Sequence, residues 1–236
     1  MKIVSTSYVN TASFNDPVLW LERINFYTGI LEQLATRNEV ESIEQINYSG
    51  ELKKNNVTYH FLNFKKPVLY FPGQLHAHIQ KLQPGVVLVN GFIFPLQIIQ
   101  LRIKLGSGVK IIVINQAERP FHGIKKYLQQ LAGKYIDAFL FSAGELGKEW
   151  IENGNIKNSR KIYEVMHGSS FFCASNKGNA RTTLSITGST IFLWVGRLND
   201  NKDPLTVVKA FLQFSTFNPG AKLYMIFKSA ASLPGS

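Results

Sequence analysis

The sequence predicts an α/β protein in which a parallel sheet wrapped by helices is followed by a shorter strand-helix-strand unit. Short apolar runs alternate along the chain with stretches whose apolar residues recur at helical spacing. The run Val86–Val89 is apolar at every position, as is typical of strands buried on both faces of a parallel sheet. The same alternation restarts at Ile191, after a stretch rich in Ser, Asn, Gly and Thr. These three observations predict the fold class.

The first part of the chain alternates strand and helix patterns. The predicted strands are Lys2–Ser7, Val40–Tyr48, Val57–Phe64, Val86–Val89, Val109–Ile114, Asp137–Ser142 and Lys161–Met166. The predicted helices are one over Leu19–Leu34, preceded by turn and cap residues at Ser13–Pro17, then Gln74–Leu82, Phe94–Leu105, Ile124–Tyr135 and Glu145–Glu152. Between the second and third strands, Ser49–Asn56 is predicted to be a turn.

The second part begins with the run I-F-L-W-V-G at Ile191. Asp203 can cap a following helix, and Pro204 suits its first turn. That helix leads to a predicted strand at Ala221–Phe227, and the tail beyond it continues no element. We therefore predict a first domain over residues 1–172, a linker over 173–189 and a second, incomplete domain over 190–236.

Composition is that of an ordinary folded domain, with 45% hydrophobic and 17% charged residues among 236. The single cysteine, Cys173, cannot form an internal disulfide, which fits a reducing compartment. The N-terminus turns polar too soon for a secretory signal. We expect a cytoplasmic protein.

A formal net charge of +11 makes an anionic partner a serious expectation. The classes to weigh are nucleic acid, a membrane surface and a phosphorylated substrate. The chain has neither zinc-finger spacing nor an RNP-like aromatic motif, so a nucleic-acid partner is not favoured. Peripheral contact with an anionic membrane would explain the same charge. His76 and His78 are close in sequence but lack a third ligand at convincing spacing, and we expect no metal site.

Two cations, Arg197 and Lys202, lie between the strand that starts at Ile191 and the helix that follows it. The N-terminus of a helix exposes backbone N–H groups that favour anions. A diphosphate would fit such a loop, and guanidinium is well suited to bind it. The alternative is that both residues are solvated loop charges.

The order G-R-L-x-x-x-K-D-P, followed by a helix, Pro219 and a strand, resembles the retaining GT-B glycosyltransferases of family 4. The run D-A-F-L-F-S, then W-I-x-x-G and K-I-Y-E-V-M-H-G-S-S-F, is similar to the close of that family's N-terminal domain. The resemblance implies a GT-B type fold of two Rossmann-like domains with the active site in the cleft between them. It also implies that Arg197 and Lys202 hold the diphosphate of a nucleotide-sugar and that Gly196 lets the ligand approach the backbone.

Further candidate cleft residues follow two strands of the first domain. Asn90 and Gly91 end one strand, although a tight turn would also explain them. In the loop N-Q-A-E-R-P-F-H-G, Gln116 stands where many members of the family carry a histidine beside the transferred sugar. Its amide can bond a hydroxyl but cannot exchange a proton near pH 7. Glu118 is a candidate catalytic carboxylate, the alternative being a local ion pair with Arg119.

The resemblance implies a metal-independent transfer of a sugar, with retention, from a nucleotide diphosphate-sugar to an acceptor hydroxyl. The acceptor would be a sugar or a lipid-linked molecule in cell-surface polysaccharide or glycolipid synthesis. The family's paired glutamates, which contact the donor, would lie beyond Ser236, so we expect this chain alone to be an inactive fragment. The alternative is a non-catalytic, degenerate GT-B binding domain at a membrane surface.

Overall fold

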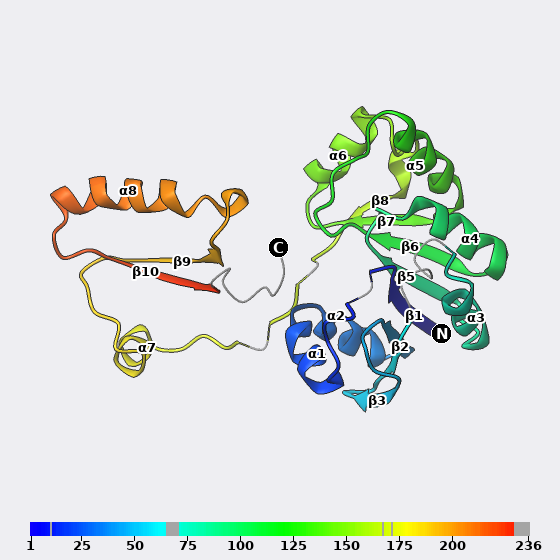
Figure 1. Ribbon diagram of the computed structural model, residues 1–236, viewed down its shortest axis with the longest axis horizontal. Coiled ribbons are helices and arrows are strands. Elements are labelled where there is room, and N and C mark those ends of the chain that lie inside the picture. Colours follow the sequence, from blue (N-terminus) through cyan, green and yellow to red (C-terminus); the bar gives the residue numbers. More distant parts are fainter. Residues whose placement is uncertain (10, 65–70, 167, 171, 229–236) are drawn as a thin grey trace. The chain divides into compact units, whose positions relative to one another are not determined.

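The computed structural model describes residues 1–9, 11–64, 71–166, 168–170 and 172–228 (Figure 1). The chain divides into two compact units, Met1–Phe171 and Phe172–Ser236. The predicted tail over 229–236 lies outside the described residues. In the described part, no helix combines the length and apolarity that crossing a bilayer requires.

The first unit contains one large sheet flanked by helices. Its strands are β1 (Lys2–Ser7), β2 (Glu39–Glu44), β3 (Gly50–Lys54), β4 (Val57–Phe61), β5 (Val86–Asn90), β6 (Lys110–Ile114), β7 (Ala138–Phe141) and β8 (Ile162–Glu164). Its helices are α1 (Pro17–Arg23), α2 (Asn25–Ala35), α3 (Gly73–Lys81), α4 (Pro95–Leu105), α5 (Ile124–Tyr135) and α6 (Gly144–Glu152).

The strands of this sheet lie in the order β3-β4-β2-β1-β5-β6-β7-β8. Neighbouring strands are parallel except β3, which pairs antiparallel with β4 at the edge. Parallel strands need crossover connections, and the helices between them supply these. The predicted α/β fold class is therefore confirmed.

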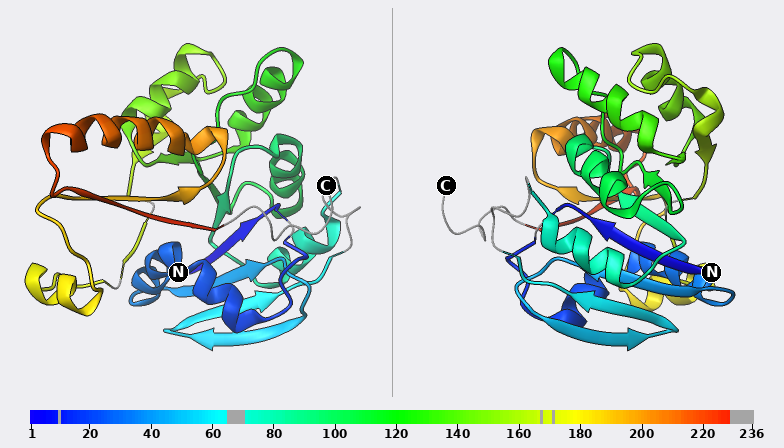
Figure 2. Two further views of the ribbon diagram at one scale, coloured as in Figure 1. Left: turned by 60° about the vertical axis from the view of Figure 1, so that its left-hand side comes forward. Right: turned by 90° about the vertical axis from the view of Figure 1, so that its right-hand side faces the viewer.

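Apolar side chains cover both faces of the sheet. Trp20, Leu21 and Leu31 of α1 and α2 pack with the inward side chains of β2 and β4 on one face. Helices α3 to α6 cover the other face, where Trp150 stacks on Phe92. Figures 1 and 2 show these two helical layers on opposite sides of the strands.

Two predicted elements of the first unit were wrong. The helix predicted over Leu19–Leu34 is interrupted at Ile24, which ends α1 and precedes α2. The predicted turn at Ser49–Asn56 is mostly strand β3, and only Asn55 and Asn56 turn the chain. The polar sequence E-L-K-K carries little strand signal, because an edge strand with one wet face need not be apolar.

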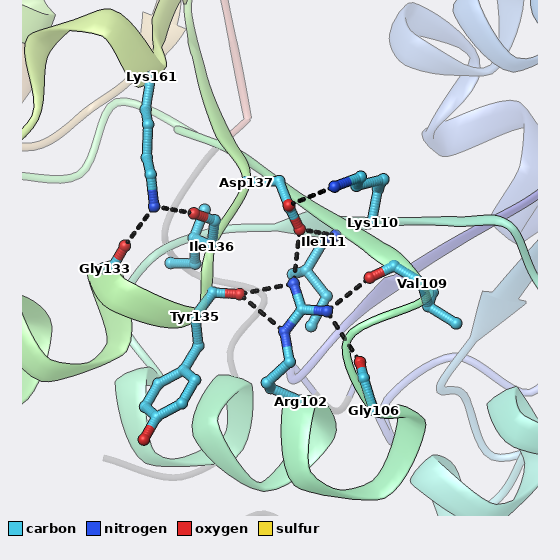
Figure 3. A network of polar contacts seen from close by, with 10 residues as sticks. All are labelled: Arg102, Gly106, Val109, Lys110, Ile111, Gly133, Tyr135, Ile136, Asp137 and Lys161. Atoms are coloured by element: carbon cyan, nitrogen blue, oxygen red, sulfur yellow. Dashed lines mark hydrogen bonds and ion pairs between the residues drawn. The ribbon is translucent and has the colours of Figure 1, made fainter.

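A polar network ties α4 and α5 to the amino ends of β6 and β7 (Figure 3). The Arg102 guanidinium donates to Asp137 Oδ2 at 2.5 Å and to the carbonyl oxygen of Tyr135 at 2.8 Å. Burial alone would raise the pKa of Asp137, but hydrogen bonds from Ile111 N–H, Lys110 and Arg102 lower it overall. This network fixes the carboxyl end of α5 at the sheet edge where β6 and β7 begin.

The second unit contains α7 (Lys177–Thr183), β9 (Ile191–Arg197), α8 (Pro204–Phe217) and β10 (Lys222–Lys228). Strands β9 and β10 pair in parallel, so this part is one strand-helix-strand unit, as predicted. Phe192 packs on Phe211 and Phe214 of α8. Residues 173–189, predicted to be a linker, contain helix α7, which begins after the capping residue Asn176.

Candidate functional site

The strand order of the first unit indicates where a ligand would bind. From β1 the chain proceeds through β2 to β4 on one side, whereas β5 to β8 extend on the other. The neighbours β1 and β5 are therefore the point at which the strand order reverses. Ligands of open α/β sheets bind outside the carboxyl ends of the strands at such a point. Those ends are Ser7 and Asn90, which pair in register.

A cavity of about 310 Å³ lies at this place. The carboxyl ends of β1, β2 and β5, the start of α2 and the loop after β6 form its walls. It is lined by Thr6, Ser7, Val9, Thr11, Trp20, Ile24, Phe26, Tyr27, Ile43, Glu44, Gln45, Asn90, Gly91, Ile93, Gln116 and Glu118. An apolar groove of about 350 Å³ adjoins it and shares Tyr27, Asn90 and Gln116 with it.

The four candidate residues of the first unit all line this one cavity: Asn90, Gly91, Gln116 and Glu118. The Asn90 amide donates to Ser5 Oγ at 3.1 Å and to the carbonyl oxygen of Thr6 at 3.2 Å. Gln116 Nε2 donates to Asn90 Oδ1 at 3.3 Å. The two amides are thus held in a chain of hydrogen bonds that starts at β1.

Glu118 is held by backbone N–H groups. Its Oε2 accepts from Gln116 N at 2.6 Å, and its Oε1 accepts from Phe92 N at 3.3 Å. Burial raises the pKa of Glu118. The hydrogen bonds favour the charged form and lower the pKa, but burial has the larger effect. Within the described residues no ion pair joins Glu118 to Arg119. The carboxyl group therefore braces the loops after β5 and β6 while it lines the cavity.

Gly91 is required at its position for two reasons. Its φ of +95° is a conformation that side chains with a Cβ rarely adopt. A Cβ added there would also lie 2.8 Å from Glu118 Oε1. The tight turn at Gly91, which was the alternative explanation of this residue, is therefore present. The missing side chain also leaves space for the Glu118 carboxyl group beside the backbone.

The sequence did not single out Glu44, which is buried in the wall of the cavity. Its carboxyl oxygens accept from Trp20 Nε1 at 2.9 Å, from Ser42 Oγ at 2.7 Å and from the Tyr27 hydroxyl at 3.3 Å. Burial raises the pKa of Glu44 although these donors act in the opposite direction. Glu44 could have been identified from the sequence, because it is an acidic residue inside the predicted strand Val40–Tyr48.

In the second unit, Arg197 ends β9 and Lys202 lies in a short 3-10 turn before α8. Asn199 Oδ1 accepts from Lys202 N at 3.2 Å, and Asp203 Oδ1 accepts from Thr206 N at 3.3 Å. Asp203 is therefore the cap of α8, as predicted. Both cations are exposed, and neither has a carboxylate partner among the described residues.

Gly196 has a structural neighbour in its own strand. A Cβ added at Gly196 would lie 2.8 Å from Cζ2 of Trp194. The Trp194 ring therefore occupies the space beside this glycine on the face of β9 that α8 covers.

The described residues contain no group of three His, Cys, Asp or Glu side chains arranged to hold a metal ion.

Known structures share this fold, whereas no family model and no curated protein matches the sequence. Sucrose-phosphate synthase from Thermosynechococcus elongatus has a TM-score of 0.63 and 12% identity, over 95% of this chain and 62% of that chain. HepE from Anabaena, solved with UDP and glucose, has a TM-score of 0.58 and 9% identity, over 98% of this chain and 62% of that one.

The UDP-N-acetylglucosamine 2-epimerase from Rickettsia bellii has a TM-score of 0.52 and 12% identity, over 100% of this chain and 65% of that one. This chain thus spans less than two thirds of the length of these three proteins. Identities this low report the fold alone, and one fold hosts several chemistries. The fold of the chain is that of GT-B proteins.

Proposed function

We propose that this chain is part of a retaining GT-B glycosyltransferase of family 4, which moves a sugar from a nucleotide diphosphate-sugar to an acceptor hydroxyl. The observation that carries the proposal is the loop between β9 and α8. There Arg197 and Lys202 precede a helix N-terminus and lack carboxylate partners within the described residues. The likeness in fold to a protein solved with UDP and glucose supports a nucleotide-sugar donor.

The two cations act on the leaving group. Cleavage of the bond to the sugar builds negative charge on the departing diphosphate. The Arg197 guanidinium offers two parallel donors, and Lys202 adds a point charge. Such groups stabilise the developing charge more than the bound ground state, which raises kcat. No metal ion is proposed for this step, because the protein supplies the positive charge itself.

The cavity at β1 and β5 binds the acceptor in this proposal. The amides of Asn90 and Gln116 can hydrogen-bond sugar hydroxyls, and Glu118 can accept from a hydroxyl with its remaining lone pairs. A sugar or lipid-linked acceptor of cell-surface polysaccharide or glycolipid synthesis fits this chemistry. We place the protein in the cytoplasm, at the inner face of the membrane.

The test is transfer from a panel of nucleotide-sugars, measured with the natural-length protein that carries this chain. Arg197→Ala and Lys202→Ala are each expected to lower kcat by about a hundredfold, the scale for losing one donor to a transition-state charge. Lys209→Ala, an exposed cation on α8, is the matched control and should leave kcat unchanged. Equal activity of Arg197→Ala and wild type would make this loop structural, and loss of turnover in EDTA would reject a metal-free reaction.

A second candidate function is a non-catalytic binding domain at a membrane surface. Gln116 favours it, because an amide cannot exchange a proton, and its Nε2 is already hydrogen-bonded to Asn90. A binding domain would neither transfer nor hydrolyse any donor of the panel. It would still bind a sugar acceptor in the cavity, as the transferase would, so turnover of the donor panel and not acceptor binding separates the two candidates.

A further inference from the structure

Helix α5 buries one polar side chain, Gln129, on its inward side. Gln129 and Ala132 are its fully buried residues. Gln129 Nε2 donates to the carbonyl oxygen of Phe92 at 2.9 Å, and its Oε1 accepts from Phe121 N at 3.0 Å and from Asn155 Nδ2 at 2.7 Å. A buried amide held by three hydrogen bonds defines the rotation of the helix about its axis.

The opposite side of α5 carries a stripe of large apolar and aromatic residues. Ile124 is 82% exposed, Tyr127 66%, Leu131 41% and Tyr135 36%. Their spacing of three, four and four residues places them along one line of the helix surface. Figure 3 shows the Tyr135 ring pointing away from the Arg102 network that holds its backbone. A helix facing only water normally carries polar residues on this side.

Cations flank this stripe. Lys125 and Lys134 are exposed on α5, and neither has a carboxylate partner among the described residues. The adjacent helix α4 also exposes Ile103 (75%) and Lys104, but these line a groove with Gly73, His76 and Gln80 of α3. Neither helix contains an aspartate or glutamate. Helix α6, in contrast, carries three exposed acidic residues, Glu145, Glu149 and Glu152.

We propose that this surface, made of Ile124, Tyr127, Leu131 and Tyr135 with Lys125 and Lys134, docks on an anionic lipid bilayer. An apolar stripe can enter the boundary between headgroups and acyl chains, and tyrosine rings are well suited to that boundary. Lysines beside the stripe extend toward anionic headgroups. The lysines of this surface lack carboxylate partners among the described residues and would be attracted to a negatively charged membrane. We therefore favour an anionic bilayer over a protein as the partner of this surface. The surface is independent of the proposed glycosyl transfer, so each can fail alone.

The test is co-sedimentation of the whole chain with vesicles of phosphatidylcholine, with and without phosphatidylglycerol. Wild type is expected to bind the vesicles that contain phosphatidylglycerol, less so as salt is added. The double variant Lys125→Glu, Lys134→Glu should partition at least about tenfold more weakly. The matched control Lys53→Glu, Lys54→Glu makes the same charge change on the exposed edge strand β3 and should bind like wild type.

The apolar part of the surface has its own pair of variants. Tyr127→Glu, Leu131→Glu should lose binding, whereas Val18→Glu, Leu19→Glu on α1, at 53% and 57% exposure, should keep it. Thermal unfolding checks that each variant is folded, and the salt dependence of wild type needs no variant at all. Equal binding of wild type to both kinds of vesicle, no binding to either, or equal losses in test and control variants would overturn the proposal. Absence of vesicle binding would assign the stripe to a protein partner.

Discussion

Glu44 shows how one residue of the cavity couples its chemistry to stability. Trp20 Nε1 can only donate, so one carboxyl oxygen of Glu44 must act as an acceptor. Ser42 and Tyr27 can donate to the other oxygen or accept from it. Burial dominates this balance and raises the pKa of Glu44. The folded protein therefore holds the Glu44 proton more tightly than the unfolded chain does.

A pH dependence of stability follows from this raised pKa. An acid whose pKa is higher in the folded state stabilises the fold below its unfolded value, and this contribution is lost as pH rises through the folded value. Glu44→Gln removes the titration and keeps an acceptor for Trp20. We expect the variant to match wild type below the ordinary value of 4.5 and to gain in melting temperature over wild type above it.

Thermal unfolding between pH 4 and pH 8 measures this difference, with Glu22→Gln on the exposed side of α1 as the control. A constant difference between Glu44→Gln and wild type across the range would contradict the raised pKa. The control makes the same change at an exposed side chain and tests whether the effect is specific to Glu44.

At the scale of elements, the hairpin that joins β3 to β4 depends on two consecutive residues with positive φ. Asn55 has a φ of 49° and Asn56 a φ of 64°. Two-residue hairpins of this kind match the twist of their strands, and they favour Asn followed by Gly. Asn tolerates this conformation better than other residues with a Cβ, but not as well as glycine.

Substitution at Asn56 is therefore expected to change stability in both directions. Asn56→Gly should raise the free energy of unfolding, and Asn56→Val should lower it by about 1–2 kcal/mol. Urea denaturation measures both. Lys54→Gly, in the extended backbone of β3 just before the turn, is the control and should destabilise, because glycine weakens a strand. A loss of stability in Asn56→Gly would show that the Asn56 side chain matters more than its backbone.

At the scale of the whole molecule, the hydrophobic core belongs to the first unit. Every buried residue of the two core clusters lies between Ile3 and Ile156. Among the described residues of the second unit, Ala221 is the only buried hydrophobic residue. Buried apolar area drives folding, so the first unit holds most of the stabilising contacts of the described chain.

Residues 1–171 alone are therefore expected to fold. The predicted melting temperature of this piece lies within a few degrees of the main transition of the 236-residue chain. Differential scanning calorimetry of both proteins compares the two values, and limited proteolysis shows whether the piece resists digestion. A piece that melts far below the chain, or that is digested like an unfolded protein, would mean that the second unit contributes to this core.

The sequence by itself determined the α/β class, most strand and helix positions and the cap at Asp203, because periodicity and capping are local properties. It also identified Asn90, Gly91, Gln116 and Glu118 as residues that follow strands. Only the tertiary structure placed these four in one cavity, added Glu44 to its wall and bound Glu118 to backbone N–H groups. Strand order, burial and helix rotation depend on contacts between distant residues, as the outward stripe of α5 also shows, and no local pattern encodes them.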